Sequence, residues 1–243
     1  MVPMLFQIHW LNIMQTWLNT NLKNPLKNKP RMTKSTMTKP SKKRGKFITL
    51  EGMDGAGKST HIPNIIAALL ARGLEVISTR EPGGTKLGEQ LRTLLLHDAM
   101  HAETETLLMF AARREHIATI IEPALKRGAY VLSDRFTDAS YAYQCGAKGV
   151  ASSKIKQLET WVQGSLQPDL TLLFDVPVAI SMTRLSTARE PDKFEREDAK
   201  FFEKLRQAYL TRAAENPARF RVIDANQSLD KVKVLVENII STI

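Results

Sequence analysis

A glycine-rich loop constrains this chain more than any other part of its sequence. Residues 50–60, LEGMDGAGKST, follow a short apolar run and precede a segment of helical period. The loop fits the pattern G-x-x-x-x-G-K-[ST], in which backbone N–H groups and a helix N-terminus hold the phosphates of a nucleoside triphosphate. The motif therefore predicts a strand, a phosphate-binding loop and a helix in that order. It does not say what the nucleotide is used for.

Apolar segments of strand length alternate with helical segments through the rest of the chain. The expected strands are 47–50, 75–79, 130–133, 170–174 and 220–223. The expected helices are about 58–72, 86–96, 103–127, 152–164, 177–187, 196–215 and 229–241. This alternation predicts an α/β fold of the P-loop NTPase type, a doubly wound parallel five-stranded sheet with helices on both faces. Ligands bind beyond the carboxyl ends of the strands in such sheets.

The net charge of +10 belongs to the N-terminal segment of the chain. Residues 1–46 hold ten of the 35 Lys and Arg residues and no Asp or Glu, which leaves 25 basic against 25 acidic residues in 47–243. A balanced body gives no reason to expect a nucleic-acid partner.

Residues 1–45 are interpreted as a basic, disordered extension. Residues 1–22 carry no charged side chain and place aromatic and aliphatic residues at roughly helical spacing, so a weak membrane-surface or partner anchor is one alternative. The favoured interpretation is an extension without function, with Met32 or Met37 as plausible true starts. We expect neither a transmembrane helix nor a signal peptide, and no membrane for the body of the chain. The single cysteine, Cys145, suits a cytoplasmic protein.

Charged residues follow the second and third expected strands. Arg80 and Glu81 precede a Pro-Gly-Gly turn, and Asp134 and Arg135 end the third strand. A carboxylate at the end of a buried strand opposite a phosphate loop is the position of a Mg²⁺-organising aspartate. Arg135 is expected to have a specific partner because charges at a buried strand end are seldom left unpaired.

Two further stretches admit both a structural and a functional interpretation. Phe110 and Arg114 are four residues apart on one helix and share a face. Either Phe110 is a core residue and Arg114 flanks the core, or the two residues stack on a base and hydrogen-bond to it. The basic stretch 184–196, RLSTAREPDKFER, is either a solvated connection or a mobile lid.

Taken together, the motifs resemble the thymidylate kinases of the bacterial type, which transfer a phosphoryl group from ATP to dTMP. The resemblance covers nearly all of residues 46–243. It is carried by FITLEGMDGAGKST, TREPGGT, LMFAARR, VLSDRF, SYAYQ, PDLTLLFDV and DKFERE, in the family's order and spacing. It implies a nucleoside monophosphate kinase domain that converts dTMP to dTDP, a step of dTTP synthesis, with a short lid at about 184–196.

The resemblance also assigns an acceptor site. Phe110 would stack on thymine, Arg114 would hydrogen-bond its carbonyl edge, and Asp54 would meet the sugar hydroxyl. Arg135, with Arg80 or the backbone of the turn at 81–84, would steady the acceptor phosphate. The complete expected dTMP-binding set is Asp54, Glu81, Phe110, Arg114, Arg135, Ser140 and Gln144.

For the donor, the resemblance implies ATP and Mg²⁺. The expected ATP-binding residues are Gly52, Met53, Asp54, Gly55, Ala56, Gly57, Lys58, Ser59, Thr60, Ala225, Asn226 and Gln227. The stretch at 224–227 would line the adenine. Ser59 and Asp134 are the expected metal ligands.

The expected catalytic residues are Lys58, Asp134, Arg135 and a lid arginine, Arg189. One branch of the family carries an arginine in the phosphate loop at the position of Gly55, so this chain must supply that charge from its lid. Arg189 is the leading candidate, ahead of Arg184 and Arg196.

The chain departs from the family pattern at three positions. Lys193 replaces a common arginine, and Cys145 and Lys148 interrupt what is usually a Gly-Gly-x-Arg-Gly stretch. Lys193 would make a second lid contact a point charge in place of a bidentate fork. Cys145 and Lys148 bear on details of acceptor binding and leave the reaction class unchanged.

Two alternatives stay open. One is a kinase for another nucleotide or nucleoside, because a few contacts decide which substrate a pocket accepts. The other is a nucleotide-dependent switch, which the absence of an Asn-Lys-x-Asp motif disfavours. The resemblance also suggests a homodimer through the helix expected at 103–127.

Overall fold

The computed structural model describes residues 43–186 and 192–243. They contain one five-stranded sheet, ordered β2-β3-β1-β4-β5, in which every neighbouring pair is parallel. The strands are β1 (Phe47–Glu51), β2 (Val76–Arg80), β3 (Tyr130–Asp134), β4 (Leu170–Asp175) and β5 (Phe220–Asp224). Each strand lies within one residue of its expected range at either end, and the predicted α/β class is confirmed.

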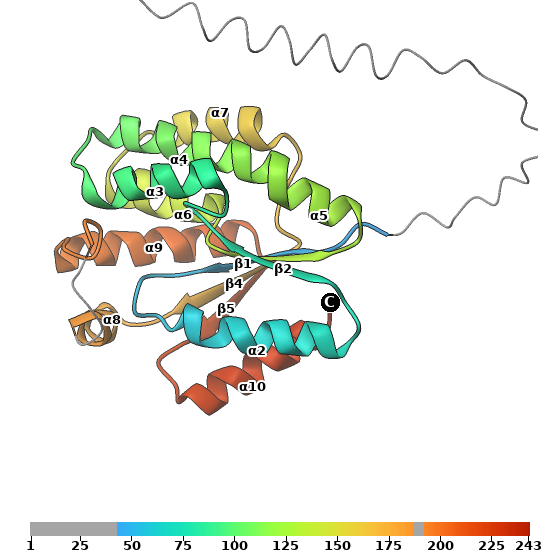
Figure 1. The fold of residues 1–243 in the computed structure, drawn as a ribbon. Coiled ribbons are helices and arrows are strands. Elements are labelled where there is room, and N and C mark those ends of the chain that lie inside the picture. The colour runs from blue at the N-terminus through green and yellow to red at the C-terminus, as the bar shows by residue number, and fades with distance from the viewer. Residues whose placement is uncertain (1–42, 187–191) are drawn as a thin grey trace, which may run out of the picture. The chain divides into compact units, whose positions relative to one another are not determined.

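Helices cover both faces of this sheet. In chain order they are α2 (Lys58–Ala71), α3 (Lys86–His97), α4 (Ala102–His116), η1 (Ile117–Ile121), α5 (Glu122–Lys126), α6 (Thr137–Ser140), η2 (Tyr141–Ala147), α7 (Ser152–Gln163), α8 (Val178–Ser186), α9 (Ala199–Glu215) and α10 (Leu229–Ser241). Figure 1 shows α2 and α10 on one face and α4, α7 and α9 on the other.

Strand β1 is the centre of the hydrophobic core. All five of its residues are buried, because β3 and β4 flank it and helices cover both faces. Successive side chains of a strand point to opposite faces. Accordingly, Phe47 packs with Phe110 and Phe136, while Ile48 packs in the other cluster with residues such as Ile65. The apolar run before the phosphate loop thus anchors the loop between two cores.

The helix expected at 103–127 has an interruption. It runs as α4, a π-helical turn η1 and the short helix α5, which has Pro123 in its first turn. A proline within a helix removes one N–H donor and its ring clashes with the carbonyl four residues earlier. The wider turn at Ile117–Ile121 lets the chain continue as a helix through Pro123.

The segment after β3 is helical, which the sequence did not reveal. Helix α6 and the π-helical η2 carry Ser140 and Gln144, both about 1% exposed. Buried polar residues obscure the apolar periodicity by which a helix is recognised.

At the N-terminal boundary, Arg44 and Gly45 are already attached to the sheet domain. Arg44 donates to Asp169 at 2.7 Å, and the Gly45 amide donates to the Leu125 carbonyl at 2.9 Å. The expectations for residues 1–42 lie outside the described residues. Among the residues that are described, no helix has the length and apolar character needed to span a membrane.

Candidate active site

The phosphate loop joins β1 to α2 as the motif predicts. Gly57 precedes the helix in a left-handed conformation (φ 89°), and no side chain from the described residues caps the first turn of α2. The first N–H groups of a helix have no partner within the helix, and they attract anions. Met53 and Ala56 pack in the core, whereas Ser59 and Thr60 are exposed in the first turn. The N-terminus of α2 is therefore uncapped by a side chain and lies beside two exposed hydroxyl residues.

Lys58 lies folded over its own loop. Its Nζ donates to the carbonyls of Gly52 at 3.0 Å and Met53 at 2.8 Å, and the side chain is 5% exposed. Burial lowers the pKa of Lys58 and nearby Arg135 lowers it further, while Asp54 and Asp134 counteract them. A phosphate oxygen bound in the loop can take the place of these two carbonyl oxygens as the acceptor for Nζ.

Arg135 links β3 to the phosphate loop. Its backbone is left-handed (φ 69°), which is unusual for a residue with a side chain. Nη1 donates to the Gly52 carbonyl at 2.8 Å, and Nη2 donates to Asp54 Oδ1 at 2.7 Å. Tyr143 donates to the other oxygen of Asp54 at 3.0 Å. Burial opposes ionisation of Asp54, but Arg135 and Lys58 outweigh it and hold its pKa well below the usual range.

Asp134 has the features expected of a metal-organising carboxylate. It ends β3 beside Leu50 of β1, and its buried Oδ1 has no hydrogen-bond partner among the residues that the structure describes. Within the same described residues, no group of three His, Cys, Asp or Glu could hold a metal alone. Mg²⁺ is commonly held by one or two protein oxygens together with substrate phosphates and water. An unpartnered carboxylate oxygen fits that mode of binding.

A cavity opens next to Asp54 and Arg135. Its lining is Asp54, Glu81, Pro82, Arg92, Leu96, Met109, Arg113, Arg135, Phe136, Ala139, Ser140, Tyr143, Gln144, Asp192 and Phe194. The lining combines three arginines and three carboxylates with apolar side chains. Five of the seven residues expected to bind dTMP are in this set, and the two that are not are Phe110 and Arg114.

Arg113 is held rigidly in the cavity wall. Its Nε donates to Glu81 Oε2 at 2.7 Å, and Nη2 donates to the Phe136 carbonyl at 3.2 Å and to Ser140 Oγ at 3.1 Å. The other oxygen of Glu81 accepts from His116 at 2.9 Å. The remaining nitrogen, Nη1, is buried and without a partner in the described part of the chain. Arg113 thus combines a place in the cavity lining with one donor that no described residue satisfies.

The expected pair Phe110 and Arg114 is one residue out of register. Phe110 is 1% exposed and packs in the core, with the Arg113 guanidinium 4.5 Å from its ring centroid. Arg114 points to α7, where Nη1 donates to the Val162 carbonyl at 2.6 Å. Met109 and Arg113, also four residues apart, are the pair that lines the cavity. Contrary to the prediction, Phe110 and Arg114 are not among the residues that line this cavity.

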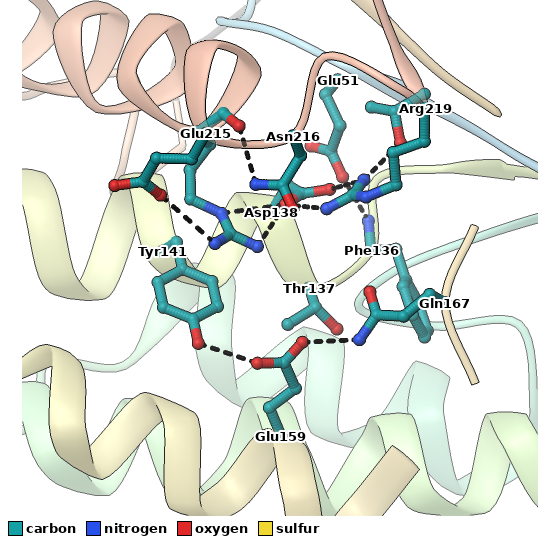
Figure 2. Close-up of polar contacts among 12 residues, drawn as sticks. Glu51, Phe136, Thr137, Asp138, Tyr141, Glu159, Gln167, Glu215, Asn216 and Arg219 are labelled. Atoms are coloured by element: carbon teal, nitrogen blue, oxygen red, sulfur yellow. Dashed lines mark hydrogen bonds and ion pairs between the residues drawn. The ribbon is translucent and has the colours of Figure 1, made fainter. Parts of the chain in front are cut away.

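A polar network behind the cavity fixes the start of α6. Figure 2 shows Asp138 at its centre. Asp138 is 1% exposed and accepts from Arg212 at 3.0 Å and from Arg219 at 2.6 Å. Nearby, Glu51 accepts from the Phe136 amide at 2.8 Å. These contacts determine where α6, and with it Ser140, meets the cavity.

The segment after β5 meets the phosphate loop through α8. Arg184 donates to the Gly55 carbonyl at 3.3 Å and to the Ala225 carbonyl at 3.2 Å. Asn226 and Gln227 are exposed beside Asp224, to which both donate. Arg184 is thus a bridge between the two segments expected to contact ATP, and it lies in a helix.

The rest of the expected lid is only partly described. Arg189 lies outside the described residues, and Arg196 is exposed. Lys193 makes an ion pair with buried Glu105 at 2.9 Å, and Phe194 lines the cavity. The C-terminal end of the basic stretch therefore lies at this cavity.

Gly55 cannot readily carry a side chain. Its φ is 77°, and a Cβ there would lie 2.6 Å from the Ser181 carbonyl oxygen of α8. The Ser181 hydroxyl also donates to the Asp54 carbonyl at 2.5 Å. The loop and α8 are too close for a larger residue at this position.

Sequence reasoning missed several cavity residues. Arg92, Met109, Arg113 and Tyr143 line the cavity, and Arg80 does not; it pairs with Glu89 at 2.9 Å on the surface. The sequence did carry one usable signal. Phe110, Ile117 and Ile121 recur at helical spacing, which marks Phe110 as part of the core face.

Comparisons with known proteins agree with this geometry. A family model described as thymidylate kinase matches residues 50–236. The thymidylate kinase of Methylobacillus flagellatus is 69% identical over 190 residues, covering 78% of this chain and 94% of the relative. That of Cupriavidus pinatubonensis is 64% identical over 202 residues, covering 82% of this chain and 100% of the relative. The crystal structure of thymidylate kinase from Ehrlichia chaffeensis has a TM-score of 0.65 at 33% identity, covering 81% of this chain and 98% of that one.

Proposed function

This chain belongs to the thymidylate kinase family, a family of phosphotransferases, and we propose that it transfers the γ-phosphoryl group of ATP to dTMP, forming ADP and dTDP. The observation that carries the proposal is the cavity beside the phosphate loop, which contains Asp54, Arg113 and Arg135 together. A second nucleotide bound there would have its phosphate next to the donor loop. This juxtaposition is what in-line transfer between two nucleotides requires.

The cavity wall at α4 and η2 suits a thymine base. Met109 gives an apolar surface, and Arg113 Nη1 is an unpartnered donor within the described residues. Gln144 donates its amide nitrogen to Glu105 at 3.0 Å, so its amide oxygen is the polar atom left to face the cavity. Thymine presents a carbonyl acceptor next to an N3–H donor. We assign the carbonyl to Arg113 and the N3–H to Gln144.

The acceptor sugar and phosphate are assigned to the loop side of the cavity. Asp54 would accept from the sugar hydroxyl, since its carboxylate is 33% exposed and kept ionised by Arg135. Arg135 and Arg92 would hold the acceptor phosphate; Arg92 is fixed by its contact with the Pro82 carbonyl at 3.0 Å. Both guanidinium groups would reduce the repulsion between the acceptor phosphate and the donor phosphates.

Lys58 and Mg²⁺ are assigned to the donor. Lys58 would exchange its two loop carbonyls for phosphate oxygens, and Ser59 and Asp134 would hold the ion. When bound, Mg²⁺ neutralises charge on the donor phosphates. The residues of this chain align the two nucleotides and exclude water from between them.

Arg189 is proposed as the lid arginine that stabilises the transferring phosphoryl group. Support comes from Gly55, where the backbone and the Ser181 carbonyl leave no room for a charged side chain. Arg184 is occupied as a bridge to Gly55 and Ala225.

A coupled assay of ADP release, with and without dTMP, tests the proposed function. We expect turnover that depends on dTMP, with kcat/KM for dTMP above that for dUMP, UMP and thymidine. ATP hydrolysis that is independent of dTMP would support a nucleotide-dependent switch and would contradict the proposal. A preference for another acceptor would support the alternative of a different nucleotide kinase.

We further propose a homodimer and a cytoplasmic location. Leu107 of α4 and Trp161 of α7 are 56% and 81% exposed and line one groove, which suits a symmetric contact. The location is supported by the substrate pair and by a single cysteine.

A further inference from the structure

Glu105 of α4 connects the acceptor cavity to the end of the lid. Its carboxylate is 0% exposed, and it accepts hydrogen bonds from three side chains that come from different parts of the chain. Gln144 of η2 donates at 3.0 Å, Lys148 donates at 2.8 and 2.9 Å, and Lys193 lies 2.9 Å away. A buried carboxylate needs such partners, since an unpaired buried charge is strongly destabilising.

The two lysines are not equivalent. Lys148 contacts both oxygens of Glu105 and is sufficient to neutralise it. Lys193 adds a second positive charge and also donates from Nζ to the Asp98 carbonyl at 3.0 Å, while its amide donates to the Leu96 carbonyl at 3.3 Å. Neutralising Glu105 does not require Lys193. Its contacts instead attach the segment 192–197 to α3 and α4.

Phe194 makes this attachment relevant to the cavity. Its ring lines the cavity and is 6% exposed. Lys148 and Lys193 lie 4.5 and 5.1 Å from the ring centroid, and Tyr143 packs against it edge-on at 5.6 Å. Tyr143 in turn donates to Asp54. The ion pair of Lys193 therefore holds an aromatic wall of the cavity.

The Glu105 carboxylate also orients the side-chain amide of Gln144. An ionised carboxylate is an acceptor only, so it can bond to the amide nitrogen of Gln144 and not to the amide oxygen. Burial raises the pKa of Glu105, but the hydrogen bonds from Lys148, Gln144 and Lys193 lower it overall, so the carboxylate stays ionised. The amide oxygen of Gln144 is thereby directed to the cavity.

We propose that Glu105 is a positioning residue for the acceptor: it sets the amide of Gln144 for a base with an N–H donor and, through Lys193, fixes Phe194 in the cavity wall. The inference rests on the proposed function and goes beyond it by naming the group that sets the base preference. Two family departures, Lys148 and Lys193, meet at this carboxylate.

The test uses the full-length protein and compares dTMP with dCMP. Glu105→Gln gives the residue an amide that donates as well as accepts, so Gln144 can turn its nitrogen to the cavity, where it matches the N3 acceptor of cytosine. We expect the ratio of kcat/KM for dTMP over dCMP to fall about tenfold or more, the range for a mispaired buried hydrogen bond. The KM for ATP should change less than about twofold.

Two further variants separate the two roles of Glu105. Lys193→Met keeps Lys148 and Gln144 in place, so we expect a several-fold higher KM for dTMP and an unchanged dTMP/dCMP ratio. Glu103→Gln is the matched control, because Glu103 is on the same helix and pairs with exposed Lys154. It should leave the dTMP/dCMP ratio and the KM for dTMP unchanged, although Glu103 lies in the groove of the proposed dimer contact, so the sedimentation of this variant is recorded as well.

The outcomes distinguish the inference from the proposed function. If the unmodified protein shows no dTMP-dependent turnover, the proposed function fails and the inference fails with it. If the unmodified protein is active and Glu105→Gln lowers kcat/KM for both nucleotides equally, Glu105 is only structural and the inference is overturned. Should Glu105→Gln not fold, an unchanged dTMP KM in Lys193→Met overturns it.

Discussion

Asp54 is the residue where the two proposed nucleotide sites meet. It belongs to the phosphate loop, yet its carboxylate bonds to Arg135 and Tyr143 in the cavity wall. Because Arg135 and Lys58 depress its pKa, the charge is present throughout the physiological range. Two features thus explain a carboxylate in a phosphate-binding loop. Arg135 and Lys58 neutralise its charge, and the carboxylate is proposed to bind the sugar hydroxyl of the acceptor.

Removing this charge should impair acceptor use more than donor use. We predict that Asp54→Asn lowers kcat/KM for dTMP roughly 100-fold, a size typical of a misplaced substrate, with a smaller change in KM for ATP. Steady-state kinetics with Asp230→Asn as an exposed control measures both. Equal losses for the two substrates would argue against the assignment.

Glu51 predicts a pH dependence of stability. Burial and then the nearby Asp138 raise its pKa to about 8, well above the ordinary value. The folded state therefore binds a proton that the unfolded state releases between about pH 4.5 and 8, and this contribution to the free energy of unfolding is lost as pH rises through that window. Glu51→Gln should flatten the fall in Tm between pH 5 and 8. A parallel pH profile for the two proteins would contradict this.

Spacing alone does not decide which pair of α4 residues faces the cavity. Met109 with Arg113 and Phe110 with Arg114 are both four residues apart, so periodicity allows either pair to face the cavity. The resemblance assigns the aromatic residue, Phe110, to stacking on the base. In the structure Phe110 instead belongs to an apolar core cluster with Ile117.

At the scale of elements, the strands were predictable and the segment after β3 was not. Strands of a parallel sheet buried on both faces are nearly continuous apolar runs, and β1, β3 and β4 have that character. Helices α6 and η2 instead bury Asp138 and Gln144, whose partners come from α9 and α4. Those partners are distant in sequence, so no local sequence pattern predicts these helices.

The close packing of the phosphate loop against α8 predicts which element supplies the catalytic charge. We expect Arg189→Ala to lower kcat more than tenfold with a modest change in the dTMP KM, since such arginines contribute on the order of 10³-fold or more in related transfers. Gly55→Arg should not restore the rate of that variant, because of the left-handed φ and the Ser181 carbonyl. The double variant measured against each single variant tests this, and a restored kcat would refute it.

At the scale of the whole molecule, the sheet brings the proposed donor and acceptor sites to one edge. The loops after β1 and β3 both open at the carboxyl ends of neighbouring parallel strands. The sequence predicts this edge because the prediction depends on all strands being parallel, which the sheet confirms, and not on their order. It could not predict which side chains close the cavity.

The exposed apolar groove between α4 and α7 predicts the state of assembly. We expect Leu107→Glu to shift the protein towards monomer in sedimentation velocity, because a carboxylate would be buried at the proposed interface. Leu235→Glu, on α10 and 38% exposed in the unmodified protein, is the control that should leave the state unchanged. An unmodified protein that sediments as a monomer would exclude the proposed dimer.

The most direct test of the account compares two adjacent arginines. Arg113 lines the cavity with an unpartnered donor within the described chain, whereas Arg114 bonds to α7. We predict that Arg113→Met lowers kcat/KM for dTMP by about 100-fold or more, as a lost charged hydrogen bond in a buried site does, while Arg114→Met stays within about threefold, with Tm recorded for both. Equal effects, or a larger effect of Arg114→Met, would contradict the assignment of this cavity as the thymidylate site.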